Sequence, residues 1–135
     1  MDNCVLTVWR CEICGLMVEN LSNPANNTPI CCGQKMTVLS CNTTDGAIEK
    51  HVPQVCNYTT ASNGYKTGIL VSVGSVPHPM SEDHYIEWIE VIDNNKVMRT
   101  KLVPGDKPEA FFEIASHKGL IVRAYCNKHG LWKKS

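Results

Sequence analysis

The sequence lacks both a net charge and any long apolar run. Its 135 residues include 13 basic and 13 acidic side chains, so no overall field favours nucleic acid or an acidic membrane surface. No apolar run approaches the roughly 20 residues that span a bilayer, and the first residues lack the basic stretch and apolar core of a secretory signal. These absences predict a soluble, cytoplasmic protein that binds neither nucleic acid nor membrane.

The chain also lacks a long helical pattern, since no stretch of ten residues carries apolar side chains at helical spacing. From residue 46 onward it shows short apolar runs separated by Gly, Pro, Asn or Asp: KTGILVSV, HYIEWIEVI, KVMRTKLV, EAFFEIA and LIVRAYC. This pattern is typical of an antiparallel β sandwich or barrel. With 43% hydrophobic residues, the chain can bury one modest core and carry a small appendage.

Eight cysteines stand out in a chain of this size. In a reducing cytosol, metal or redox chemistry explains them better than persistent disulfides do. Cys11 and Cys14 form a Cys-x-x-Cys pair, and Cys31 and Cys32 are adjacent. The segment up to about residue 37 is too small to fold on apolar burial alone, so a structural ion is expected there. Four thiolates suit zinc or iron equally well.

The adjacent pair, Cys31 and Cys32, sets a geometric condition. Neighbouring side chains of an extended backbone point to opposite sides. Both thiolates can therefore bind one ion only if the backbone is locally twisted.

Five histidines form a second group of candidate ligands, and most of them lie beside Pro or Gly or at the end of an apolar run: His51, His78, His84, His117 and His129. An extended chain would separate His78 from His84 by roughly 20 Å, whereas two nitrogens on one ion lie ~3 to 4 Å apart. The segment between them must therefore turn back, and PHPMSED contains the prolines and the Ser and Asp that suit a turn.

Cys126 is the candidate thiolate partner of these imidazoles. It shares the parity of Val122 and Ala124 along the last apolar run, which predicts a side chain on the core face of a strand. His129 follows three residues later, in the expected loop. A thiolate from the core and imidazoles from the rim could close around a single ion.

Four stretches of the chain, taken together, resemble the two-iron superoxide reductases called desulfoferrodoxins: CEIC…CCGQKM, EKHVP, VPHPMSEDHYIEWIEV and YCNKHGLWK. They occur in the family's order and run from Cys11 to Lys133. The resemblance implies an all-β protein. It has a small desulforedoxin-like metal-binding unit over residues 1–37 and an immunoglobulin-like antiparallel β sandwich over residues 38–135.

The resemblance also implies two iron ions per chain, each with its own ligands. The ligands implied for the first iron are four thiolates: Cys11, Cys14, Cys31 and Cys32. Those implied for the second, catalytic iron are four equatorial imidazoles and one axial thiolate: His51, His78, His84, His129 and Cys126. His117 matches no ligand position, and Cys4, Cys41 and Cys56 are expected to be ordinary thiols.

The implied activity is the reduction of superoxide to hydrogen peroxide, a detoxification that releases no dioxygen. Four imidazoles and a thiolate leave a sixth position open to a small anion. In the family, the lysine that matches Lys50 stands over this position, and the glutamate that matches Glu49 binds the oxidised iron. The resemblance further implies a homodimer and a rubredoxin-type or other small electron-donor protein.

Two other classes of protein are alternatives. A metal-binding electron carrier of the cupredoxin or rubredoxin kind would not reduce superoxide. Its blue-copper form needs only two histidines and usually an axial methionine, which HGLWKKS does not contain. A zinc-bearing interaction module would use only the amino-terminal cysteines. Neither alternative explains the four spaced histidines. Trp88 and Trp132 are expected to pack in the core or at its rim.

Overall fold

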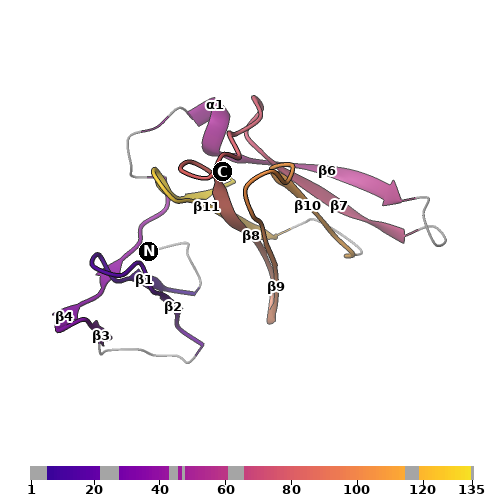
Figure 1. Ribbon diagram of the computed structural model, residues 1–135. Helices are drawn as coiled ribbons and strands as arrows, with labels where there is room; N and C mark the ends of the chain where they lie inside the picture. Colours follow the sequence, from indigo (N-terminus) through magenta and orange to yellow (C-terminus); the bar gives the residue numbers. More distant parts are fainter. Residues whose placement is uncertain are drawn as a thin grey trace. The chain divides into compact units, whose positions relative to one another are not determined.

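The computed structural model describes residues 6–21, 28–42, 46, 48–60, 66–114 and 119–134 (Figure 1). The chain divides into two compact units, Met1–Cys41 and Asn42–Ser135. The described residues form strands and one short helix, which confirms the predicted all-β class. Within these residues, no helix is long and apolar enough to cross a membrane.

The described residues of the first unit form five short strands, β1 (Val8–Arg10), β2 (Met17–Glu19), β3 (Ile30–Cys31), β4 (Gln34–Lys35) and β5 (Thr37–Val38). They form an antiparallel sheet in the order β2-β1-β5 and a separate β3-β4 ribbon. The boundary expected at residue 37 falls in β5, which pairs with β1, so the unit continues beyond it. Its core consists of Trp9, Cys11 and Met36, which is too little apolar surface to stabilise it alone.

In the second unit, the described residues form the helix α1 (Ile48–His51) and the strands β6 (Pro53–Thr60), β7 (Lys66–Val73), β8 (Ile86–Asp93), β9 (Lys96–Lys101), β10 (Glu109–Phe112), β11 (Ile121–Cys126) and β12 (Gly130–Lys133). One antiparallel sheet has the order β10-β7-β6 and the other the order β12-β11-β8-β9. The first, second and fifth strands of the unit thus share one sheet, an immunoglobulin-like arrangement. The predicted sandwich is confirmed.

The core of the sandwich lies between the two sheets and follows the period-two alternation of its strands. Its central members are Val71 from β7, Val91 from β8, and Val122, Ala124 and Cys126 from β11. Full burial of one aliphatic side chain contributes about 1.5–3 kcal/mol. Cys126 therefore points into the core, as its parity predicted, at the end of a strand that the whole core holds in place.

A buried ion pair lies on the opposite face of the second sheet. Glu90 in β8 and Arg123 in β11 are fully buried, and Nε of Arg123 donates to Oε1 of Glu90 at 2.8 Å. Arg99 in β9 donates to the other carboxylate oxygen of Glu90. One carboxylate therefore connects three adjacent strands.

The hairpin of β6 and β7 extends beyond the rest of its sheet (Figure 1). β6 pairs with β7 from Pro53 to Thr60, whereas β10 pairs with β7 only between Ser72 and Ile69. The outer part of the hairpin is therefore a two-stranded ribbon. On β6, the side chains from Cys56 to Thr59 are exposed.

Candidate metal centres

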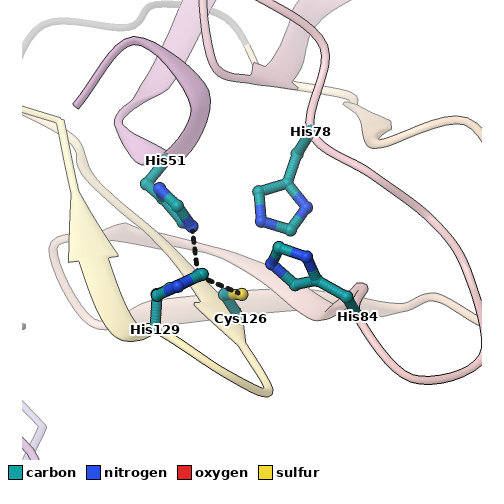
Figure 2. A group of neighbouring side chains, drawn as sticks. All are labelled: His51, His78, His84, Cys126 and His129. Atoms are coloured by element: carbon teal, nitrogen blue, oxygen red, sulfur yellow. Dashed lines mark hydrogen bonds between the residues drawn. The ribbon is translucent and has the colours of Figure 1, made fainter. Parts of the chain in front are cut away.

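Separate elements of the second unit bring the candidate ligands of the histidine–cysteine site together (Figure 2). His51 is the last residue of α1, and His78 and His84 lie in the segment between β7 and β8. Cys126 ends β11, and His129 lies in the turn before β12. Residues 78 apart in the chain thus meet at one end of the sandwich.

The four imidazole rings form a closed circle in which each ring meets two others edge to face. The centroid of His51 lies 4.7 Å from those of His78 and His129. The centroid of His84 lies 4.8 Å from that of His78 and 5.0 Å from that of His129. One donor atom from each ring and Sγ of Cys126 all lie within 4.8 Å of one another.

The distances between donor atoms match a shared metal ion. Nε2 of His51 and Nδ1 of His129 are 3.1 Å apart, and neighbouring nitrogens ~2.1 Å from one ion would lie ~3.0 Å apart at a right angle. Sγ of Cys126 lies 3.7 Å from the same Nδ1. The five side chains therefore fit one ion held by four imidazoles and a thiolate.

Two ring nitrogens at this site lack any other partner among the described residues. Nδ1 of His78 donates to the carbonyl oxygen of Pro79 at 2.7 Å, which leaves Nε2 as the unprotonated nitrogen. Nε2 of His78 and Nε2 of His84 are buried without a hydrogen bond to any described group. Burying a ring nitrogen unpaired is costly, and metal ligation removes that cost.

The protonation of these ligands also suits a metal. Burial lowers the pKa of His78 to about 4, and burial likewise lowers the pKa of His84. Both rings are therefore neutral near pH 7, as metal ligation requires. Burial raises the pKa of the Cys126 thiol, while the backbone N–H groups of Lys128 and His129 act in the opposite direction. A bound cation would favour the thiolate.

The segment between His78 and His84 turns back, as predicted. The backbone N–H of Ser81 donates to the carbonyl of His84 at 3.0 Å, and the N–H of His84 donates to the carbonyl of Ser81 at 3.1 Å. This pair closes a tight turn, and the turn allows the two imidazoles to meet despite the five residues between them.

Glu49 and Lys50 precede His51 in α1, and their side chains are exposed. The carbonyl of Glu49 accepts hydrogen bonds from the N–H of Val76 at 2.9 Å and from Oγ of Ser75 at 3.3 Å. Gly74 has φ +85°, and a Cβ there would lie 2.6 Å from the same carbonyl oxygen. The backbone that carries Lys50 is therefore held against the segment that leads to His78.

Trp132 touches two ligand residues, a role that the sequence analysis missed. Its ring stacks on His51, with centroids 4.9 Å apart and an interplanar angle of 23°. Its Nε1 donates to the carbonyl of His129 at 2.8 Å. The packing predicted for Trp132 is therefore packing against the ligand residues themselves. Only the spacing of three residues between His129 and Trp132 could have signalled it.

The four-cysteine site lies in the first unit, and its sulfur atoms lie within 4.8 Å of one another. Sγ of Cys31 is 3.6 Å from Sγ of Cys14 and 3.9 Å from Sγ of Cys32. Four thiolates ~2.3 Å from one ion would lie ~3.8 Å apart in a tetrahedron. Cys32 has φ +52°, which is the local twist that adjacent ligands require.

Four thiolates at the four-cysteine site require a bound cation. A hydrogen bond from the backbone N–H of Cys14 lowers the pKa of Cys11 to about 6. The close Sγ of Cys14 raises the pKa of Cys31 to about 12. Without a cation the four thiols cannot all ionise near neutral pH, whereas a bound metal ion allows this.

The remaining cysteines and His117 have three different outcomes. Cys56 is a free, exposed thiol, in line with expectation. Cys41 is disulfide-bonded, so the expectation of an ordinary thiol is wrong there, because spacing along a chain does not show which sulfurs meet in space. Cys4 and His117 lie outside the described residues. Trp88 stacks on Tyr125 with centroids 6.0 Å apart.

An immunoglobulin-like sandwich with a histidine–cysteine site, preceded by a small four-cysteine unit, defines a class of non-haem metalloproteins with two centres. The family model described as Desulfoferrodoxin matches residues 43–135. The model described as Desulfoferrodoxin, N-terminal domain, matches residues 4–39. The chain belongs to the desulfoferrodoxin family, and its two ligand groups are the sites of two iron ions.

Individual relatives agree with this assignment. The chain is 50% identical over 127 residues to the desulfoferrodoxin of Syntrophotalea carbinolica, covering 94% of each chain. It is 36% identical over 99 residues to the superoxide reductase of Pyrococcus horikoshii, covering 63% of this chain and 84% of the relative. Among solved structures, the superoxide reductase from Treponema pallidum matches with a TM-score of 0.74 at 25% identity, covering 96% of this chain and 98% of that one.

Proposed function

We propose that the histidine–cysteine site is where this protein acts as a superoxide reductase. The reaction is O₂•⁻ + e⁻ + 2H⁺ → H₂O₂, and it releases no dioxygen. The observation that carries the proposal is the closed circle of four imidazoles with the buried Cys126 thiol, meeting within the reach of one ion. Relatives named as superoxide reductases support it.

Iron held by the four imidazoles and Cys126 would supply a one-electron reductant. The protein supplies the rest. His78 and His84 bring no charge of their own, because burial lowers the pKa of both rings and keeps them neutral. Cys126 brings one negative charge from a core strand, which fixes its position on the buried side. The anionic substrate must therefore approach from the side opposite the core.

Lys50 and Glu49 are proposed to act on that approach. The chain has no net charge, so a single exposed ammonium beside a ligand can dominate the local field that a small anion experiences. Lys50 attracts superoxide and helps deliver a proton through water. Glu49 would offer a carboxylate to the oxidised metal. The position of both residues immediately before His51 in α1 supports these roles.

The proposal extends to partners and location. Each turnover consumes one electron, so a rubredoxin-type or other small electron-donor protein must restore it. Exposed apolar side chains on the first unit, among them Leu16 and Ile30, support a homodimer. Six described cysteines are free, and thiolate ligands persist in a reducing compartment, which supports a cytoplasmic location and a role against oxidative stress. The disulfide at Cys41 counts against that location.

The test is to expose the reduced protein to pulsed superoxide and measure peroxide and dioxygen. One peroxide per superoxide without dioxygen is expected, and the same protein stripped of iron serves as the control. Substantial dioxygen would mark a dismutase instead, and unconsumed superoxide would reject the proposal. Metal analysis should find two irons per chain, since one copper would indicate an electron carrier and zinc alone an interaction module.

A further inference from the structure

Asn127 connects the two segments that carry most of the iron ligands. It follows Cys126 directly and is half-buried. Its Oδ1 accepts a hydrogen bond from the N–H of Tyr85 at 2.9 Å, and its Nδ2 donates to the carbonyl of Asp83 at 3.1 Å. Its backbone N–H also donates to the carbonyl of Tyr85 at 3.2 Å. Asn127 is thus bonded to both chain neighbours of His84.

These bonds bridge ligands that come from different parts of the fold. Cys126 is fully buried at the end of a core strand, so the core fixes its position. His84 is half-buried but ends an exposed turn, and its ring must still meet His129 at a centroid distance of 5.0 Å. An amide presents a donor and an acceptor in one rigid plane. It can therefore fix the turn at two points at once, before and after His84.

We propose that Asn127 is a positioning residue of the iron site. It holds the turn that carries His84 at the distance from Cys126 and His129 that a shared ion requires. It does not touch the reacting atoms and acts only through the ligand. Groups that orient metal ligands in this way commonly change metal affinity 10- to 100-fold when they are removed.

The first test compares Asn127→Ala with the parent protein and with the control Asn57→Ala, which alters an exposed asparagine on β6. Iron transfer to a chelator and paramagnetic resonance are both measured on the full, iron-loaded chain. Transfer of iron to a chelator should become roughly 10- to 100-fold faster at the histidine–cysteine site of Asn127→Ala. The paramagnetic resonance of its ferric iron should also change. The four-cysteine site of the same chain should be unaffected, which provides an internal check of folding.

A second variant separates positioning from folding and from charge. Asn127→Asp has the same shape and keeps the acceptor for Tyr85, but it places a second oxygen against the carbonyl of Asp83. An added negative charge near the iron would by itself hold the cation more tightly. Faster iron transfer from this variant therefore supports the lost donor as the cause. Unchanged or slower iron transfer from Asn127→Asp overturns the proposal, and so does an unchanged resonance in Asn127→Ala. Superoxide activity is measured separately on the parent, so a failure there would not be confused with these outcomes.

Discussion

Lys50 is an exposed cation immediately before the ligand His51. The reaction with superoxide joins a monoanion to a chain of zero net charge, so local attraction sets much of the association rate. Lys50→Ala should slow the bimolecular step by roughly tenfold and flatten its dependence on ionic strength. Stopped-flow or pulsed measurements at several salt concentrations test this, with Lys50→Arg as the control that keeps the charge. Equal rates for Lys50→Ala and the parent at every salt concentration would contradict it.

Gly74 lets the segment that follows β7 lie close against α1, which carries the ligand His51. Its φ is +85°, and a Cβ would lie 2.3 Å from the carbonyl oxygen of Val76. Gly74→Ala should therefore destabilise the protein by about 3 kcal/mol or more, because left-handed strain adds to a backbone clash. Gly105→Ala is the matched control, since Gly105 has φ +95° and open space around it, and it should cost about 1–2 kcal/mol. Thermal unfolding of both variants measures the difference, and equal losses would show that no clash exists.

The ligand residues could be predicted from the sequence because they stand in four recognisable stretches. The residues that hold them could not. Asn127, Gly74 and Trp132 act through contacts across 42, 25 and 81 positions of the chain, respectively. Such contacts follow from the folded path of the backbone. The spacing of three residues between His129 and Trp132 is the single local sign of any of them.

At the scale of elements, the ion pair of Glu90 and Arg123 ties β8 to β11, with Arg99 of β9 on the same carboxylate. The side chain of Arg123 is fully buried, whereas that of Arg99 is 40% exposed. Arg123→Met should therefore cost about 3–5 kcal/mol, because it leaves the buried Glu90 carboxylate without its buried partner. Arg99→Met should cost about 1 kcal/mol or less. Denaturant unfolding compares the two, and similar losses would refute this division.

The strands of the sandwich were predictable where apolar residues dominate and less so elsewhere. The run KTGILVSV coincides with β7, the next run covers all of β8 except Asp93, and the following three runs contain β9 to β11. The apolar runs did not mark β6 or β12. β6 carries polar side chains at most positions and lies at the edge of its sheet, so little of it is buried. β12 is only four residues long, which is too short for a periodic signal.

For the molecule as a whole, the two units should respond differently to the loss of one metal. Among the described residues, the core cluster of the first unit has three buried members and depends on its ion, whereas the second unit has a full sandwich core. Cys14→Ser should therefore unfold the first unit and leave the second folded. Hydrogen exchange measures this directly, with fast exchange expected in β1 and retained protection in β8 and β11.

The matched control for Cys14→Ser is Cys56→Ser, which removes an exposed free thiol of the second unit. It should leave the exchange of both units unchanged. Loss of protection throughout the chain in Cys14→Ser would show that the two units fold as one cooperative body.

The neutral edge of β6 has a consequence for the protein at high concentration. Within the described residues β6 pairs only with β7, and its eight residues include no charged side chain. Such a strand offers a row of amides and carbonyls as a template to any extended peptide. An edge strand of the other sheet, β9, carries Lys96, Arg99 and Lys101, which repel a second copy. Aggregation and fibre growth should therefore begin at β6.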